Sequence, residues 1–225
     1  NSCMLTDGRR GSWILLAEIL TDLEVEPDVP IRKDCGRCRI CIDRCPTGAI
    51  VEPYRVDARL CISYLTIENK GAIPLEMRPK MGKWIFGCDV CQEVCPYNRL
   101  TQPTEDPAFA PRVGVGPNPL LIPLMGLDAR GFKELFKGSP VLRPKRRGFL
   151  RNVAVALGNA KDPIALPALS RALSDEEPLI RSHSAWALGR IGGQEARSAL
   201  EAARPAESDE AALAEISLAL ETLGE

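Results

Sequence analysis

The sequence lacks long hydrophobic runs and has almost no histidine. Its 225 residues contain no run of about 18 consecutive apolar residues, the length that a membrane-spanning helix needs. No signal-peptide pattern opens the chain. The one histidine, His183, has no evident acid–base partner, so we expect it to serve helix packing. These absences argue against a membrane-spanning protein and against a histidine-based catalytic centre.

Acidic and basic residues are nearly balanced overall but are unevenly distributed. The formal net charge is −1. Residues 1–161 hold 24 Lys and Arg against 18 Asp and Glu, whereas residues 162–225 hold 5 against 12. A polyanion would therefore prefer the first part of the chain.

Eight of the nine cysteines follow the pattern of a two-cluster ferredoxin. The first group reads Cys35-Gly-Arg-Cys38-Arg-Ile-Cys41-Ile-Asp-Arg-Cys45-Pro46. Three cysteines at a spacing of three, a fourth after four residues and then a proline form the bacterial signature for a 4Fe–4S cluster. In two-cluster ferredoxins the fourth cysteine ligates the other cluster, so the first group predicts a second one.

The second group repeats the end of this signature. It reads Cys88-Asp-Val-Cys91-Gln-Glu-Val-Cys95-Pro96, and Cys61 stands upstream, where the first cysteine of a second motif would lie. We interpret residues 62–87 as an insertion that splits this motif. The expected ligands of cluster one are Cys35, Cys38, Cys41 and Cys95, and those of cluster two are Cys45, Cys61, Cys88 and Cys91.

Two other uses of the cysteines are less consistent with the pattern. Structural zinc favours two separated Cys-x-x-Cys pairs. Disulfides are typical of small secreted scaffolds, whereas thiolate clusters belong in a reducing compartment, so we expect a cytoplasmic protein. Cys3 lies outside both groups and is expected to be a small buried hydrophobe.

The last third of the chain contains a repeat. Ala156-Leu157-Gly158, Ala187-Leu188-Gly189 and Ala219-Leu220-Glu221 follow one another at steps of 31 and 32 residues. Alanine- and leucine-rich helices at this period are typical of a short HEAT-type solenoid, which presents a surface and rarely carries chemistry. The fold class is therefore α+β: a bacterial two-cluster ferredoxin-like domain with an insertion, followed by a short all-α HEAT-like repeat domain.

Two stretches suggest a nucleic-acid contact without establishing one. The insertion mixes lysines and arginines with Tyr64 and Trp84, which can hold phosphates and bases, although a surface loop is the more common use of such a segment. The densest basic run, residues 143–151, begins the first repeat helix. The run is consistent with a solvated helix face and equally with a phosphate-binding surface.

The ordered motifs resemble the epoxyqueuosine reductase family. The resemblance rests on the sequence Cys61-Ile-Ser-Tyr-Leu-Thr-Ile-Glu68, on residues 87–98 with their Cys-Pro-Tyr-Asn ending, on the lead with Gly11-Ser-Trp13, and on the helical repeats. It implies two 4Fe–4S clusters, a cobalamin, an external electron donor and a tRNA anticodon stem-loop as substrate. The implied reaction is the reduction of epoxyqueuosine to queuosine at the tRNA wobble position, in a monomeric cytoplasmic enzyme without a membrane partner.

The resemblance also assigns segments. Residues 1–30 would be the tail of a preceding cobalamin-binding domain, which this chain does not include, so we expect a fragment that is inactive alone and assign it no catalytic proton donor. Residues 31–100 would form the ferredoxin-like domain with its insertion at 62–87. A proline-rich surface linker with one short helix would occupy 101–142, and the repeats would occupy 143–225. Within the lead, Ser12 is expected to cap a buried helix over residues 13–20.

Individual contact residues follow from the same resemblance and from the basic run. The residues expected on the cobalamin side are Ser63, Asp89, Leu5 and Leu16. Lys70 is expected to face substrate or the tRNA backbone. The candidates for phosphate contacts by the repeats are Arg143, Lys145, Arg146, Arg147 and Arg151.

Three rival functions share part of this pattern. A ferredoxin-type electron carrier docked to a partner by its repeats would need the clusters but no tRNA. A cobalamin-dependent reductive dehalogenase-like enzyme would share the cofactors but does not call for basic repeats. A zinc-stabilised tRNA-binding module would contain no iron.

Overall fold

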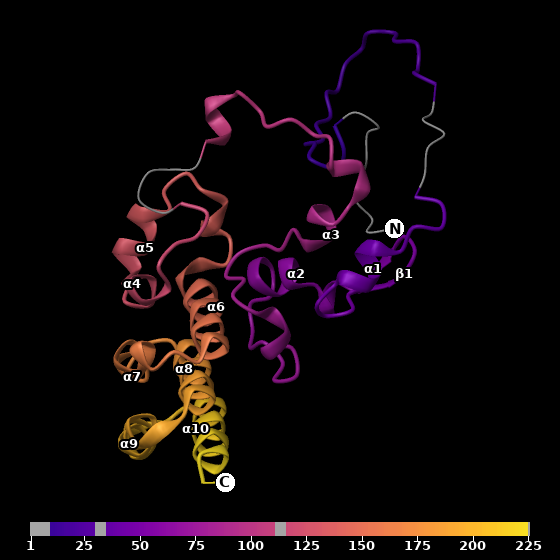
Figure 1. Ribbon diagram of the computed structural model, residues 1–225. Coiled ribbons are helices and arrows are strands. Elements are labelled where there is room, and N and C mark those ends of the chain that lie inside the picture. Colours follow the sequence, from indigo (N-terminus) through magenta and orange to yellow (C-terminus); the bar gives the residue numbers. More distant parts are fainter. Residues whose placement is uncertain (1–9, 30–34, 111–115, 225) are drawn as a thin grey trace. The chain divides into compact units, whose positions relative to one another are not determined.

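The structure is a computed structural model that describes residues 10–29, 35–110 and 116–224 (Figure 1). Contacts between residues divide the chain into two compact units. Unit one comprises Asn1–Asp57 and Asp89–Phe109, and unit two comprises Ala58–Cys88 and Ala110–Glu225. The expected insertion therefore belongs to the same unit as the repeats, although the sequence had suggested one continuous domain over residues 31–100.

Unit one is small and contains a β-hairpin. Its elements are α1 (Ile40–Arg44), β1 (Ile50–Glu52), β2 (Arg55–Val56), α3 (Val90–Glu93), η3 (Pro96–Asn98) and η4 (Pro107–Phe109). The strands pair antiparallel with Ile50 opposite Val56. Tyr54 takes a left-handed backbone conformation (φ 62°) in the turn between them, which lets the chain reverse over two residues.

The helix expected over residues 13–20 is absent, and that prediction was wrong. Residues 13–20 form neither helix nor strand, and the side chains of Leu15, Ile19 and Leu20 are 84%, 88% and 99% exposed. A helix of eight residues is stable only when tertiary packing covers its apolar side chains. The described residues supply no such cover, so the apolar composition alone was not sufficient to form a helix.

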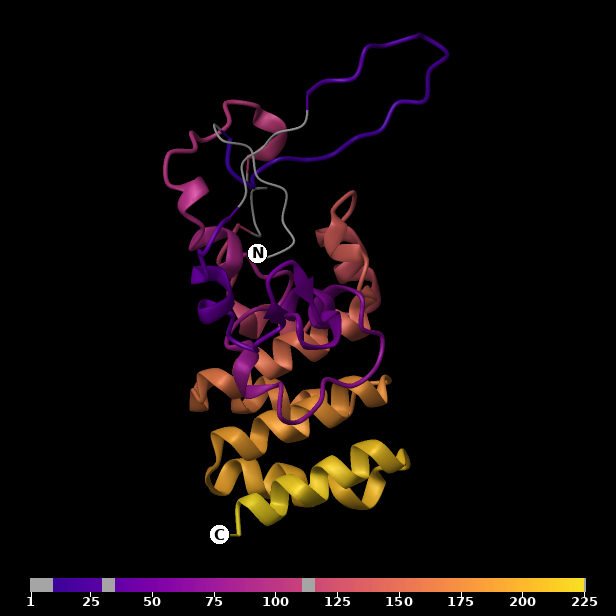
Figure 2. The same cartoon turned by 90° about the vertical axis from the view of Figure 1, so that its right-hand side faces the viewer.

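All the regular elements in the described part of unit two are helices, joined by turns and irregular segments. Its short elements are η1 (Ala58–Leu60), α2 (Ile62–Ile67), η2 (Pro79–Met81), α4 (Leu121–Met125), α5 (Ala129–Leu135), η5 (Pro140–Leu142), η6 (Pro163–Ala165) and η7 (Arg204–Ala206). The repeats are α6 (Lys145–Ala160), α7 (Leu166–Ala172), α8 (Pro178–Ile191), α9 (Gly193–Ala203) and α10 (Glu210–Thr222). The helices α6, α8 and α10 stack as one layer and α7 and α9 as another, which is the solenoid that the repeats predict (Figures 1 and 2).

Glycine sets the distance between the long helices. A Cβ atom at Gly158 would lie 2.7 Å from Cζ3 of Trp186 and 2.9 Å from Cα of Ala187. A Cβ at Gly189 would lie 2.9 Å from Cβ of Ala219. The repeated Ala-Leu-Gly therefore marks the point where each long helix crosses the small residues of the next. The third copy ends in the exposed Glu221, on the last helix of the described array.

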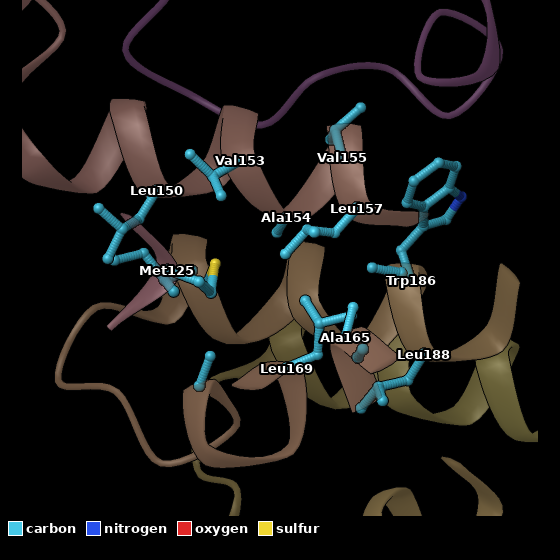
Figure 3. Close-up of a cluster of buried hydrophobic side chains, with 14 of the residues drawn as sticks. Met125, Leu150, Val153, Ala154, Val155, Leu157, Ala165, Leu169, Trp186 and Leu188 are labelled. Carbon is cyan, nitrogen blue, oxygen red and sulfur yellow. The ribbon is translucent and has the colours of Figure 1, made fainter. Parts of the chain in front are cut away.

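One hydrophobic core runs through unit two. Figure 3 shows part of it, where side chains of α6 such as Leu150 and Leu157 meet Leu169 of α7 and Trp186 of α8. The stretch 121–142 also belongs to this core, and its α5 is the one short helix that the sequence predicted within the linker region 101–142. The rings of Phe132 and Phe136 pack on Phe149 with centroids 5.6 and 4.9 Å away. The prolines of the region suggested a surface linker and gave no sign of this packing.

His183 is completely buried and is neutral. Its Nε2 accepts a hydrogen bond from the Ile73 amide at 3.1 Å, and its Nδ1 lies 2.8 Å from the Leu179 carbonyl, so Nδ1 carries the proton. Burial, and then the charges of Arg78 and Arg151, hold its pKa well below 6.5. The structure therefore confirms packing as its role, and the packing joins α8 to the segment 62–87.

We expect Gly158→Ala to destabilise the chain by about 1–3 kcal/mol, because the added methyl group overpacks the contact with Trp186 and Ala187. Urea unfolding followed by circular dichroism measures the loss. Gly126→Ala is the control, since its Cβ would meet only the Pro123 carbonyl at 3.6 Å. Equal stability of the two variants would contradict this account of the repeat packing.

The neutral His183 makes stability depend on pH. The unfolded chain binds a proton to this imidazole below about pH 6.5 and the folded chain does not, so the free energy of unfolding falls as pH decreases through that value. The stabilisation is fully present above pH 6.5. Between pH 7.5 and 5.5 the parent chain should lose about 1 kcal/mol more than His183→Gln, as measured by urea unfolding. Parallel losses in both proteins would exclude His183 as the titrating group.

Candidate iron–sulfur site

Residues 39–45 and 89–95, which contain the helical parts of the two cysteine groups, both belong to unit one and fold the same way at an offset of 50 residues. The residues before their helices, Arg39 and Asp89, have φ/ψ angles of −123°/5° and −109°/12°. The residues near their ends, Cys45 and Cys95, are extended at −64°/117° and −71°/125°. The sequence repeat is therefore a structural repeat, as a two-cluster ferredoxin-like domain requires.

Matching hydrogen bonds maintain this repeat. The Arg39 carbonyl accepts from the amides three and four residues later, those of Ile42 and Asp43, at 2.9 and 3.0 Å. The Asp89 carbonyl accepts from the equivalent amides of Gln92 and Glu93 at 2.8 Å each. In each motif these hydrogen bonds form the first helical turn, which contains Cys41 in α1 and Cys91 in α3. The second cysteine follows just beyond the helix in both motifs.

Three of the four expected cluster-one ligands lie on one tight loop. The Cys38 amide donates to the Cys35 carbonyl at 3.0 Å, and Gly36 adopts the left-handed conformation that the turn needs (φ 50°). Burial raises the pKa of the Cys41 thiol, and the neighbouring charges of Cys35 and Cys38 raise it further. A cationic metal centre shared with the neighbouring cysteines would offset this and favour the thiolate form of Cys41.

Cys45 has a different environment. Burial alone would raise the pKa of its thiol, but hydrogen bonds from Thr47 and from the backbone amides of Ala49 and Ile50 outweigh burial and lower the pKa. The Ala49 amide lies 3.3 Å from Sγ. Amide donors to sulfur stabilise cluster thiolates, so this residue suits iron–sulfur ligation.

The remaining donors are also cysteines. None of the eight is in a disulfide, and all are partly exposed. In the ranges that the structure describes, no three His, Cys, Asp or Glu side chains converge on a single metal ion. The donor set is sulfur alone, which fits 4Fe–4S clusters. Of the expected cluster-two ligands, Cys45 and Cys91 belong to unit one and Cys61 and Cys88 to unit two, and their pairing stays a prediction.

Cys61 and Cys88 stand at the two ends of the segment 62–87. Cys61 precedes α2 and has the same extended conformation as Cys45 and Cys95 (φ −74°, ψ 123°). Just before Cys88, the Gly87 amide donates to Oγ1 of Thr66 in α2 at 3.0 Å. The end of the segment is therefore bound to its beginning.

The residues expected on the cobalamin side are only partly brought together. Asp89 is exposed and lines an open cavity of about 840 Å³ in unit one together with Ser12, Trp13 and Thr101. Leu16 is exposed and does not line this cavity, and Ser63 lies on α2 in unit two. Leu5 lies outside the described residues.

A hydrogen-bond network beside this cavity was not anticipated. The Ser12 amide donates to Oδ1 of Asn98 at 2.7 Å, and Nδ2 of Asn98 donates to the Gln92 carbonyl at 2.7 Å. The side chain of Ser12 also reaches Oε1 of Gln92 at 3.0 Å. The network joins the lead to the second cysteine motif, and the asparagine in Cys-Pro-Tyr-Asn was its available sequence signal.

Several of the predicted basic residues gather where α6 begins. Nζ of Lys70 donates to the carbonyls of Ile67 and Arg143 at 3.2 and 3.1 Å, although 73 residues separate Lys70 from Arg143. Arg143 is exposed and pairs with Glu68, and Lys145 is exposed. These residues belong to unit two, so the segment 62–87 and the repeats present one basic surface.

Arg151 does not belong to that surface, and its assignment as a phosphate contact was wrong. Its side chain is completely buried, and its guanidinium donates to backbone carbonyls of the segment 62–87. Burial, with the charges of Arg147 and Arg78, lowers its pKa to about 10. No phosphate can reach a group enclosed in this way.

Arg146 is also engaged within the protein. Its guanidinium donates to both carboxylate oxygens of Asp175 and to the Leu127 carbonyl, and its side chain is 16% exposed. The hydrogen bonds that Arg146 donates to Asp175 raise the pKa of Arg146, so its guanidinium stays charged. A structural role therefore competes with phosphate binding at this position.

Two further lysines border the same surface. Lys133 and Lys137 line an open cavity of about 730 Å³ with Lys145 and Arg147. Glu134, Glu176 and Glu177 also line it. The spacing of four residues between the two lysines, just ahead of the basic run, was the sequence signal that pointed to them.

No helix in the described ranges is both long and apolar enough to cross a bilayer.

Two family models match the chain in the predicted order. Residues 34–98 match the 4Fe-4S double cluster binding domain, and residues 145–221 match HEAT repeats. The first match confirms the predicted iron–sulfur domain, and the second confirms the predicted repeats.

Curated relatives carry the same combination. The chain is 46% identical over 188 residues to the epoxyqueuosine reductase of Escherichia coli (strain K12). This alignment covers 83% of this chain and 49% of the relative. It is 41% identical over 223 residues to that of Bacillus subtilis (strain 168), covering 99% and 57%. The chain spans about half the length of the curated relatives it matches.

Solved structures share the fold. An epoxyqueuosine reductase from Bacillus subtilis superposes with a TM-score of 0.93 at 41% identity, covering 98% of this chain and 59% of that one. A crystal structure of epoxyqueuosine reductase with a tRNA-Tyr epoxyqueuosine-modified stem loop gives a TM-score of 0.91 at 40% identity, covering 99% and 59%. With the duplicated cysteine motif and the repeats in the same order, these similarities show that the chain belongs to the epoxyqueuosine reductase family.

Proposed function

We propose that this chain forms the iron–sulfur and tRNA-binding part of an enzyme that reduces epoxyqueuosine to queuosine at the wobble position of tRNA. The observation that carries the proposal is the duplicated cysteine motif, which folds alike twice and lies within the double-cluster match. Because the chain spans about half the length of its relatives, the complete reaction is proposed for the protein that contains these residues.

The reaction needs two electrons and two protons for each epoxide oxygen that leaves as water. The two 4Fe–4S clusters, when bound, would pass electrons singly, and cobalamin would supply the reductive chemistry that breaks the epoxide C–O bonds and leaves a C=C bond in the ring. The eight cysteines would hold the clusters. Asp89 and Trp13, which share the cavity in unit one, are the proposed cobalamin-side residues of this chain, together with Ser63 and Leu16. An external donor would provide the electrons.

The tRNA surface is proposed at the start of α6. Lys70, Arg143, Lys145 and Arg147 lie there, with Lys133 and Lys137 at the adjoining cavity. Basic groups at such a surface contact phosphates and position the stem-loop, whereas the wobble base must leave the anticodon stack to be reduced. The acidic carboxylates at the same cavity would repel phosphate, so the proposed contacts are those at the N-terminal end of α6.

Paired cysteine variants test the cluster assignment. Cys45→Ala/Cys61→Ala removes two ligands of one cluster and should leave about four of about eight irons per chain after anaerobic reconstitution. Cys45→Ala/Cys95→Ala removes one ligand from each cluster and should leave far fewer. Iron analysis with electron paramagnetic resonance provides the measurement. If instead the second variant keeps four irons and the first loses both clusters, the assignment of Cys45 and Cys61 to one cluster and Cys95 to the other is rejected.

Charge reversal tests the tRNA surface. Lys145→Glu/Arg147→Glu should weaken binding of a tRNA anticodon stem-loop and reduce the slope of log K against log salt by roughly one for each lost phosphate contact. Lys161→Glu is the control, because Lys161 is exposed at the opposite end of the same helix. An unchanged salt slope in the double variant would remove the repeats from the binding surface and favour an electron carrier.

A further inference from the structure

The segment between Cys61 and Cys88 is held in unit two by polar side chains of the repeat helices. Its apolar residues Ile73, Met77 and Met81 also enter the shared core. The side chains that bind it by hydrogen bonds are Arg151, Asn152 and Asn159 of α6, His183 of α8 and Glu215 of α10. Apolar contacts allow the segment to shift along the helices, whereas directional hydrogen bonds fix the positions of its backbone atoms relative to them.

Arg151 binds the end of the helix that begins after Cys61. Nη2 donates to the Leu65 carbonyl at 2.7 Å, and Nη1 donates to the carbonyls of Asn69, at 2.9 Å, and Gly71. These carbonyls lie in the last turn of α2 and in the loop after it, where a helix leaves acceptors without internal partners. A cation at this end also interacts favourably with the helix dipole.

Asn152 connects the beginning of the segment to its end. Its Nδ2 donates to the Thr66 carbonyl at 2.8 Å and to the Ile85 carbonyl at 2.9 Å. Its Oδ1 accepts from Nε and Nη2 of Arg151 at 3.0 and 2.8 Å, which fixes the orientation of the amide. With the Gly87–Thr66 hydrogen bond, it restrains the backbone within three residues of Cys88.

A structural role alone does not account for this choice of residues. Burying a guanidinium lowers stability unless every hydrogen bond is satisfied, and apolar residues of similar size often stabilise a core better. What the pair provides is register: Arg151 fixes α2, which follows Cys61, and Asn152 fixes Ile85, which precedes Cys88. Both residues are completely buried in the middle of the 16-residue helix α6.

We propose that Arg151 and Asn152 are positioning residues for cluster two, because they hold the two ends of the segment that presents Cys61 and Cys88. The inference rests on the proposed assignment of these two cysteines to one cluster. It gives the first repeat helix a second role: its buried face orders cofactor ligands, while its N-terminal end presents basic residues.

The test uses Asn152→Leu, which keeps the side-chain volume and removes both amide donors. After anaerobic reconstitution of the whole chain with ferrous iron and sulfide, bound iron should fall from about eight to about four per chain. The remaining paramagnetic signal should match that of Cys61→Ala, which lacks cluster two, and not that of Cys95→Ala, which lacks cluster one. Gly189→Ala is the matched control, because it strains the contact of α8 with α10 without touching the segment.

A milder variant covers the case in which Asn152→Leu does not fold. Asn152→Asp keeps the acceptor for Arg151 and loses only the donors to Thr66 and Ile85, so it too should lose cluster two selectively. Eight irons and unchanged spectra in a folded variant would overturn the inference, as would an equal loss of cluster two in Gly189→Ala. If Cys61→Ala itself keeps both clusters, the proposed ligand assignment fails, and the inference fails with it.

Discussion

Buried backbone carbonyls must find hydrogen-bond donors, and this requirement organises unit two. The segment 62–87 contains only short helical pieces, so many of its carbonyls lack partners within the segment. Arg151, Asn152 and Asn159 supply donors from α6, and Asn159 alone binds the carbonyls of both Arg78 and Gly82. A repeat domain, which usually presents a surface to a partner, here first completes the hydrogen bonding of its own chain.

The uneven charge distribution has a structural explanation in part. Many acidic residues of the last third are paired with arginines that link successive elements. Arg146 binds Asp175, Arg181 binds Glu207, and Arg78 of the segment 62–87 binds Glu215. Glu207 accordingly has a lowered pKa, first because of its hydrogen bond from Arg181. These carboxylates thus form ion pairs within unit two, whereas exposed basic side chains remain where α6 begins.

The features that could be predicted from sequence are those fixed by short-range spacing. The Cys-x-x-Cys motifs depend on residues within one or two turns of backbone, and the Ala-Leu-Gly repeat on a regular step of about 31 residues, and both appear as expected. The prediction of a helix over residues 13–20 failed because an apolar composition does not indicate which other residues would pack against it. The short helix within residues 126–142 was predicted, but its burial was not, because the packing of Phe132 and Phe136 on Phe149 is a tertiary contact that the prolines of the region do not indicate.

Arg151 shows why the site itself was only partly predictable. Arg147 and Arg151 are four residues apart and share one face of α6, so the sequence gives them equal claims to a phosphate. Only Arg151 lies beneath the loop at Asn69–Gly71, a contact across about 80 residues that no local pattern encodes. The same long-range contact fixes the segment after Cys61, so the residue that was misassigned from its charge is one that we propose positions a cluster ligand.

The helix α6 therefore connects two properties that belong to different parts of the proposed mechanism. Its 16 residues span about 24 Å, with the basic groups at its first turn and the Arg151–Asn152 pair one to two turns further along. A helix packed on α8 and on the segment 62–87 is a rigid element, so within unit two the basic surface and the ligand-bearing segment keep a fixed separation. Under the proposed function, a tRNA phosphate bound at the first turn would therefore lie at a defined position relative to Cys61 and Cys88.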